Sequence, residues 1–179
     1  MTAAGGTDAD TADRPEGFRR VSAALAERGH PHAPRFLEVA ARTSQEAADA
    51  LGVQVGQIAK SVIFRRRRDD VPVLVVTSGD RRVDEKKVAA LVAPAGVDGG
   101  PGGLGRADAD YVKTRTGFSI GGVAPLAHRE PPVVLIDREL FRFDEVWAAA
   151  GHPNGVFRAS PQDLVALTGA PVADVVQAG

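Results

Sequence analysis

The stretch IAKSVIF, residues 58–64, decides the fold, because its β-branched and aromatic residues, free of Gly and Pro, predict a buried strand. Strand alternation divides its side chains between two faces, with Ile58, Lys60, Val62 and Phe64 on one and Ala59, Ser61 and Ile63 on the other. Lys60 then lies on the more apolar face, where burial of an ammonium is unfavourable. Two explanations stay open: the aliphatic stem covers the core while the ammonium reaches water, or a cleft holds the cation for a phosphate or a carbonyl.

The segments around this strand predict short strands interleaved with short helices. Residues 73–77 form a second apolar run, so 58–64 and 73–77 predict a hairpin with a charged loop, RRRRDDVP. Helices are expected over residues 18–28, 43–51, 84–92, 107–116 and 160–169, with strands at 133–136, 146–150, 155–159 and 172–176. We expect the 133–136 strand, which is fully apolar, to be central.

This pattern indicates an α/β fold: a single compact domain with a mixed sheet and flanking helices. Residues 1–15 are small, polar and aperiodic, which predicts a disordered tail before a domain spanning 16–179. Residues 94–105 contain six glycines and two prolines and are expected to form a loop.

Composition excludes several function classes. The formal net charge of −1 argues against a protein dedicated to duplex DNA. The chain has no cysteine, so disulfides, thiolate metal sites and a cysteine nucleophile are excluded. No apolar run approaches the roughly 18 residues of a membrane span, and the acidic N-terminus is not a secretory signal. We expect a cytoplasmic protein that does not bind membranes.

A second candidate site is the stretch TGFSIGGVAP, residues 116–125. Gly121 and Pro125 frame a G-x-x-x-P loop with Gly122 beside it, and adjacent glycines let a ligand approach the main chain closely. Consecutive exposed N–H groups there could bind an anion or an oxyanion. A tight turn between a helix and a strand is the simpler interpretation.

Histidines and arginines give weaker signals. His30 and His32 form an H-x-H pair without a third ligand at a sensible spacing, so we expect no metal and no cofactor. His128 and His152 could line a cleft. The run Arg65 to Arg68, with Arg81 and Arg82, is either a solvated hairpin tip or a surface that attracts a polyanion.

Taken together, five stretches resemble the YbaK/prolyl-tRNA synthetase-associated domain family of aminoacyl-tRNA deacylases. The stretches occur in the family's order over about residues 45–176: QIAKSVIF, VVTSGDRRVDEKKVAAL, RADADYVKTRTGFSIGGVAPL, PVVLID and ASPQDLVALTGA. A lysine on this strand followed by TGF-x-x-GG-x-x-P is the specific combination.

The resemblance implies a curved, partly closed sheet and hydrolysis of the ester of a mischarged tRNA, here proline tRNA, by a free-standing protein. It implies that Lys60 holds the 3′-terminal adenosine and its phosphate, and that Gly121 and Gly122 stabilise the oxyanion while water attacks without covalent catalysis. The substrate-binding residues expected around them are Ser61, Phe118, Ser119, Ile120, Val123, Pro125, His128 and His152. Arg65, Arg66, Arg67 and Arg68 are expected to contact tRNA, and a synthetase that delivers the substrate is a possible partner.

Other functions remain open. A non-catalytic module of the same fold would bind an amino acid or a tRNA end, and an ordinary hydrolase would use His128 or His152. Family members that remove cysteine have an acidic residue near a Gly-rich connection, where this chain has AGHPNGV, residues 150–156. The amino acid removed is therefore left open.

Overall fold

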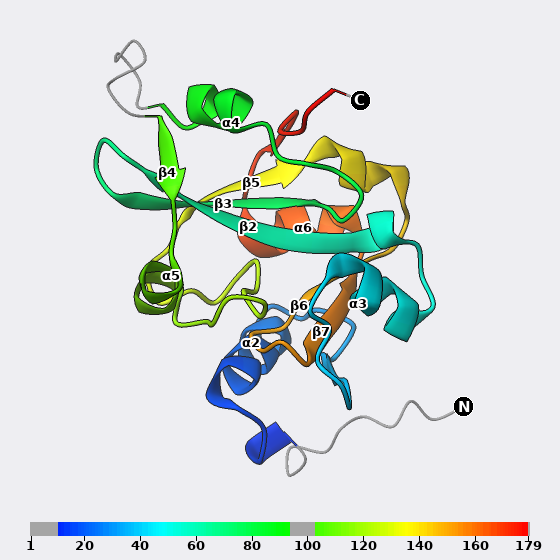
Figure 1. Ribbon diagram of the computed structural model, residues 1–179. Coiled ribbons are helices and arrows are strands. Elements are labelled where there is room, and N and C mark those ends of the chain that lie inside the picture. The colour runs from blue at the N-terminus through cyan, green and yellow to red at the C-terminus, as the bar shows by residue number, and fades with distance from the viewer. Residues whose placement is uncertain (1–10, 94–102, 179) are drawn as a thin grey trace.

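In the computed structural model, which describes residues 11–93 and 103–178, eight strands form one mixed sheet. Their order is β1-β7-β6-β2-β3-β5-β8, with β4 also paired to β2 (Figure 1). The strands are β1 (Arg35–Phe36), β2 (Ile58–Arg66), β3 (Val71–Ser78), β4 (Leu104–Arg106), β5 (Val133–Asp137), β6 (Val146–Ala149), β7 (Gly155–Ala159) and β8 (Val172–Ala173). Parallel pairs, such as β2–β6 and β3–β5, accompany antiparallel ones, so the predicted α/β fold with a mixed sheet is confirmed.

The hairpin of β2 and β3 is the centre of the sheet. The two strands pair from Ala59↔Ser78 to Arg66↔Val71, so the predicted hairpin is confirmed and each strand is longer than expected. In β3, Val73 and Val75 pack with α4 (Glu85–Leu91), whereas Leu74 and Val76 belong to the larger core on the opposite face. Alternation along one strand thus supplies two hydrophobic cores.

The other edge of β2 changes partner along its length. It pairs in parallel with β6 at Ile58 and Ala59, and antiparallel with β4 from Phe64 to Arg66. Between these pairings, residues 60–63 have a neighbour on the β3 side alone, within the described part of the chain. The sheet therefore has an opening beside the middle of β2.

Helices cover both faces of this sheet. In Figure 1, α4 lies above the β2–β3 hairpin, and α2 (Glu16–Glu27) and α5 (Ala109–Thr116) lie below it. The remaining helices are α3 (Ser44–Leu51), α6 (Pro161–Thr168) and the 3-10 turns η1 (Val55–Gln57) and η2 (Arg138–Arg142). None of the helices in the described residues is long and apolar enough to cross a membrane.

Polar residues begin several of the helices, and glycines end them. Thr43, Asp84, Asp108 and Ser160 accept main-chain N–H groups at helix starts. Gly52, Gly117 and Gly169 end helices in the left-handed conformation, which glycine adopts without the steric cost that a Cβ would bring.

Three predictions about segments need correction or qualification. Residues 94–102 of the predicted loop, and residues 1–10 of the predicted tail, lie outside the described residues. Leu104 and Gly105 were predicted to be loop but belong to β4, because their main chain pairs with β2. The 133–136 strand is one place from the sheet edge rather than central, since β8 flanks it.

In the last part of the predicted tail, the guanidinium of Arg14 lies 4.4 Å from the ring centroid of Phe36.

Helix α2 docks against the turn between β6 and β7 through glycine main chain. A Cβ on Gly17 would lie 2.2 Å from the carbonyl oxygen of Gly151, and a Cβ on Gly151 would lie equally close to that of Gly17. Gly151 also has a φ of +83°, which favours glycine. No side chain fits between the two backbones, so the first turn of α2 holds the β6–β7 turn in place.

We expect Gly17→Ala to lower the free energy of unfolding by about 1–3 kcal/mol, as overpacking of a close contact does. The methyl group must push α2 away from the carbonyl of Gly151. Urea denaturation measures the change, with Arg19→Ala on the exposed face of the same helix as the matched control. Equal stability of the two variants would contradict the close docking.

Candidate functional site

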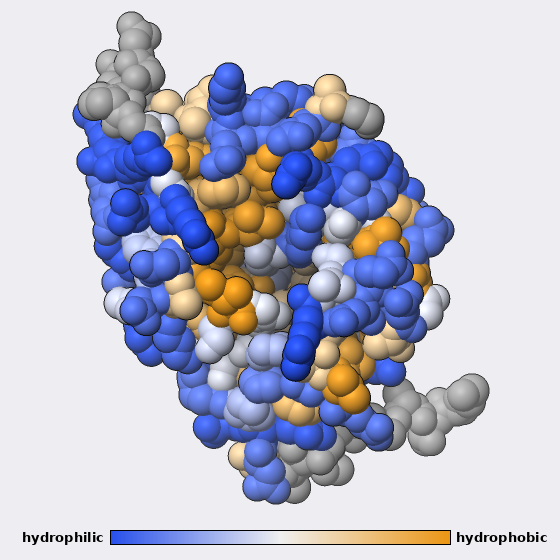
Figure 2. All heavy atoms as spheres, viewed as in Figure 1, coloured by the Kyte–Doolittle hydropathy of each residue, from blue (hydrophilic) through white to orange (hydrophobic). Residues whose placement is uncertain are grey.

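A pocket of about 180 Å³ lies at the opening beside β2. Its walls come from the start of α3, from β2, from β6 and β7, and from the glycine loop, which we define as residues 117–127. Figure 2 shows apolar residues in the middle of the face that β2 occupies in Figure 1, with hydrophilic residues around them. The lining includes Ala47, Ile58, Ala59, Lys60, Ser61, Gly121, Val123, Trp147, Ala148, Ala149, Pro153 and Val156. The structure thus brings Lys60 and Ser61 together with Gly121 and Val123, which follow about sixty positions later in the chain.

Lys60 is partly buried at this pocket. Its ammonium donates a hydrogen bond of 2.8 Å to the carbonyl of Arg81. Burial lowers the pKa of Lys60, while the carboxylate of Asp80 acts in the opposite direction. The ammonium is neither free in bulk water nor neutralised by a direct carboxylate contact, since no ion pair joins it to an acid among the described residues. It keeps unused hydrogen-bonding capacity for an anionic ligand.

Ser61 offers polar groups at the open edge. The carbonyl of Ile58 accepts a bond from Gly79 on the β3 side, so by alternation the N–H and C=O of Ser61 face the opening. The hydroxyl of Ser61 and the indole Nε1 of Trp147 are buried without a hydrogen-bond partner in the described residues. Both residues line the pocket, and buried donors without partners are rare in folded proteins. They are candidates to contact a ligand.

The glycine loop requires both of its central glycines. Gly121 has a φ of +92°, in the left-handed region that favours glycine. A Cβ on Gly122 would lie 2.7 Å from the Cα of His152 and 2.8 Å from the nitrogen of Pro153. Gly121 therefore permits the turn, and Gly122 permits close packing of the loop on the β6–β7 turn.

The main-chain donors of the loop differ from those expected. The N–H of Gly122 donates to the carbonyl of Ser119 at 3.0 Å, which closes the turn. The N–H groups of Gly121 and Val123 have no acceptor among the described residues, and both residues line the pocket. The N–H of Gly122 is thus occupied within the turn, whereas those of Gly121 and Val123 are available to a ligand.

Phe118 and His128 support the loop from inside, which differs from the expected substrate contact. Phe118 is 1% exposed, and its ring lies edge-on to that of His128. Nε2 of His128 donates to the carbonyl of Ala124, and burial lowers the pKa of His128 to about 4. Arg20 of α2 bridges the two ends of the loop through the carbonyls of Thr116 and Ala127.

The remaining predicted residues have mixed placements. Ser119 and Ile120 are exposed at the tip of the loop, and Pro125 is buried. His152 packs against Phe36 and accepts a bond from the N–H of Asn154, beside the pocket residue Pro153. Burial lowers the pKa of His152. No group of three His, Cys, Asp or Glu side chains suited to a metal occurs in the described residues.

Sequence reasoning missed the residues at the start of α3. Arg42, Thr43 and Ser44 line the pocket, and the side chain of Arg42 is exposed there. Thr43 was identified from the sequence as a helix start, which gave no signal of a second role. Only the tertiary packing of α3 against β6 and β7 brings this cation to the pocket rim.

The arginine cluster is divided by the hairpin. Arg65 pairs with Asp70 at 3.2 Å and Arg66 with Asp69 at 2.7 Å, whereas the described residues provide no ion pair for Arg67 or Arg68. Arg106 of β4 is exposed and pairs in register with Phe64, so it adds to the same end. Arg81 and Arg82 follow the opposite end of β3 and are not part of this cluster. The basic tip is therefore Arg67, Arg68 and Arg106.

Comparison with known proteins agrees with this geometry. Residues 38–167 match the family model of the aminoacyl-tRNA editing domain. The uncharacterized protein YwhH of Bacillus subtilis is 32% identical over 135 residues, which is 72% of this chain and 76% of YwhH. The proline–tRNA ligase of Limosilactobacillus fermentum is 30% identical over 103 residues, 56% of this chain but 17% of the ligase.

A solved structure gives the same result. A crystal structure of a candidate trans-editing enzyme for prolyl tRNA synthetase is 41% identical and superposes with a TM-score of 0.81. The match covers 92% of this chain and 99% of that one. The fold and pocket thus define an aminoacyl-tRNA editing domain. This chain belongs to that family, and the resemblance identified from its sequence is confirmed.

The lowered pKa of the buried His128 should make the stability of the protein depend on pH. Its folded-state pKa of about 4 is below the ordinary value of 6.5, so the unfolded chain binds a proton that the folded chain does not. The free energy of unfolding should fall as pH decreases from 6.5 to 4, by up to about 3 kcal/mol. Above pH 6.5 both states carry neutral His128 and the effect vanishes.

Urea denaturation at several pH values measures this effect. His128→Gln keeps a donor for Ala124 but cannot titrate, so its stability should decline less steeply between pH 6.5 and 4. The contribution of His152 is the same in both proteins. Parallel curves for the two proteins would exclude His128 as the source.

Proposed function

We propose that this protein is a trans-editing aminoacyl-tRNA deacylase, which hydrolyses the ester between a mischarged amino acid and tRNA. The observation that carries the proposal is the convergence of Lys60, Gly121 and Val123 on one pocket at the open edge of β2. A cation and unoccupied main-chain donors are the groups needed to hold a phosphate and an ester carbonyl. Membership of the editing family supports the same activity.

In this proposal Lys60 binds the phosphate of the 3′-terminal adenosine. Its ammonium exchanges part of its contact with the Arg81 carbonyl for the phosphate, or binds both. Arg42 at the rim supplies a second positive charge along the single-stranded end of the tRNA. The N–H groups of Gly121 and Val123 donate to the ester carbonyl oxygen. They orient the ester for attack by water at its carbon and stabilise the negative charge that develops on the oxygen.

Hydrolysis then requires no protein nucleophile. An aminoacyl ester is an activated acyl group, so positioning and one or two donors supply the several kcal/mol needed to accelerate water attack. The buried His128 is committed to Ala124, which argues against the alternative in which it acts as a base. The hydroxyl of Ser61 and the indole of Trp147 are placed to contact the amino acid or the attacking water.

The proposed substrate is mischarged proline tRNA in the cytoplasm. Two similar proteins, a proline–tRNA ligase and a candidate trans-editing enzyme for prolyl tRNA synthetase, support this choice. The same likeness supports a synthetase as the partner that delivers the substrate. The basic tip would contact the tRNA body, since Arg67 directly follows β2 and is seven residues from Lys60, or about 23 Å at the usual strand rise.

Lys60→Ala should slow deacylation roughly ten- to a hundredfold, because it removes a charge-assisted contact of about 1.5–3 kcal/mol. The measurement uses a panel of mischarged proline tRNAs, with Lys86→Ala as the control for loss of an exposed lysine. If the wild type binds tRNA ends but deacylates no member of the panel, the protein is a binding module. Full activity of Lys60→Ala would reject Lys60 as the anchor.

Replacing Arg67 and Arg68 with Gln should weaken tRNA binding and flatten its dependence on salt. Each lost phosphate contact lowers the slope of log K against log salt by about 0.7–0.9. The double variant of Arg65 and Arg66, whose charges are already paired with Asp70 and Asp69, is the matched control and should change the slope less. An unchanged slope in the Arg67 and Arg68 variant would make the basic tip a solvated turn.

A further inference from the structure

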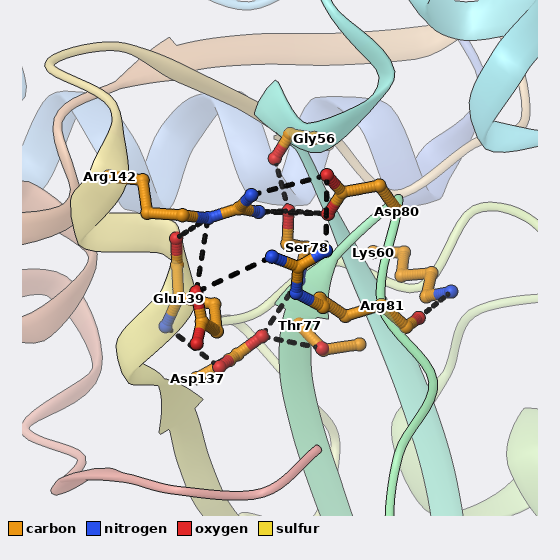
Figure 3. Close-up of polar contacts among 9 residues, drawn as sticks. All are labelled: Gly56, Lys60, Thr77, Ser78, Asp80, Arg81, Asp137, Glu139 and Arg142. Carbon is orange, nitrogen blue, oxygen red and sulfur yellow. Dashed lines mark hydrogen bonds and ion pairs between the residues drawn. The ribbon is translucent and has the colours of Figure 1, made fainter. Parts of the chain in front are cut away.

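The position of the Lys60 ammonium depends on a turn that follows β3. Its hydrogen-bond partner is the main-chain carbonyl of Arg81 at 2.8 Å, and this is its one protein partner among the described residues (Figure 3). Arg81 closes the turn through its N–H, which donates to the carbonyl of Ser78 at 3.0 Å. Any shift of residues 78–81 therefore shifts the atom that fixes Lys60.

Main-chain contacts hold the start of this turn. The N–H of Gly79 donates to the carbonyl of Ile58 at 2.7 Å, and a Cβ on Gly79 would lie 2.4 Å from the carbonyl oxygen of Val55. The N–H of Ser78 donates to the fully buried carboxylate of Asp137, which also accepts the hydroxyl of Thr77. These contacts fix residues 77–79, and main-chain bonds hold Arg81 to Ser78 and Arg82 to Gln177. Side-chain interactions add the hold on Asp80, between these anchored residues.

The second half of the turn is held by Arg142 of η2. Its guanidinium donates to both carboxylate oxygens of Asp80, at 2.8 and 3.2 Å, and to the hydroxyl of Ser78 at 2.8 Å. Figure 3 shows this guanidinium reaching across Ser78 to Asp80, on the side of the turn away from the Lys60 ammonium. A two-pronged contact of this kind fixes orientation as well as distance. Arg142 and Asp80 do not line the pocket, so they can act on substrate through Lys60.

Three charged groups act on the Lys60 ammonium. Burial lowers its pKa most, Asp80 and Asp137 raise it, and Arg82 lowers it. The hydrogen bonds from Arg142 in turn lower the pKa of Asp80, so the Asp80 carboxylate stays ionised at neutral pH. Glu139 belongs to the same cluster, since it lies 3.2 Å from Nε of Arg142, yet it is not among the groups that act on Lys60.

We propose that Asp80 and Arg142 are positioning residues for Lys60, because they hold the turn whose Arg81 carbonyl fixes the ammonium. The inference rests on the proposed role of Lys60 in binding the substrate phosphate. Loss of Asp80 removes the hold on the turn and a charge that raises the pKa of Lys60, whereas loss of Arg142 removes the hold and leaves the carboxylate in place.

The electrostatic effect can be measured without turnover. The chain has four lysines, so ¹³C labelling at Cε gives four resonances, and Lys60→Ala identifies that of Lys60. Asp80→Asn should move the titration of Lys60 to lower pH, because a group that raises its pKa has been removed. Glu139→Gln is the matched control and should leave that titration in place. Equal titration of Lys60 in the two variants would overturn the electrostatic role of Asp80.

The same comparison applies to the pH profile of deacylation, after subtraction of the spontaneous hydrolysis of the ester. If charged Lys60 is the active form, the alkaline limb of kcat/KM should move to lower pH in Asp80→Asn and stay in place in Glu139→Gln. A role of Asp80 in stability alone would lower activity without moving this limb.

The orienting effect is tested with a double-mutant cycle. Arg142→Met should lower kcat/KM about tenfold in the wild type but change it by less than about twofold in Lys60→Ala, because coupled residues are not additive. Arg142→Lys should recover part of the loss, and Arg138→Met, an exposed arginine on the same turn, should have no effect. Full additivity of Arg142→Met and Lys60→Ala would overturn the inference. If Lys60→Ala alone has no effect, the proposed function fails instead.

Discussion

The exchange of partners along one edge of β2 is the constraint on which the site depends. A strand in the middle of a sheet normally has all its main-chain groups paired, and an exposed edge is normally covered. Here β6 leaves β2 after Ala59 and β4 joins it at Phe64, so the main chain of Ser61 stays open. Lys60 lies in this part of β2 and lines the pocket, while its ammonium reaches the carbonyl of Arg81 in the turn after β3. The pocket and the free main-chain groups therefore have one structural cause.

Close contacts between main chains connect this opening to the rest of the molecule. Gly17 of α2 touches Gly151, and Gly122 of the glycine loop touches His152 and Pro153 from the other side. The β6–β7 turn is thus held between a helix and the loop without room for a Cβ in either contact. Because Arg20 of that helix also binds both ends of the loop, α2 supports the wall of the pocket that carries the proposed donors.

The site could be predicted in part from the residue types that it requires. A lysine within IAKSVIF and two adjacent glycines in TGFSIGGVAP are unusual in a strand and a loop, and Lys60 and Gly121 line the pocket. No local pattern indicated how Phe118, His128 and Gly122 are placed. Phe118 and His128 pack inside the loop, and the N–H of Gly122 donates to a carbonyl within the turn. Proximity in sequence to a motif does not reveal which side chains face the ligand.

Local patterns were sufficient to predict the hairpin of β2 and β3, the capped helices and the family, because alternation, capping residues and motif order can be recognised in short stretches of the chain. Packing between distant elements was needed to place Arg42 and Trp147 at the pocket and Arg142 at the turn beside Lys60. These contacts join residues far apart in the chain whose types are ordinary for their local elements. Their roles arise from the packing of α3, β6 and η2 around an opening that no local pattern records.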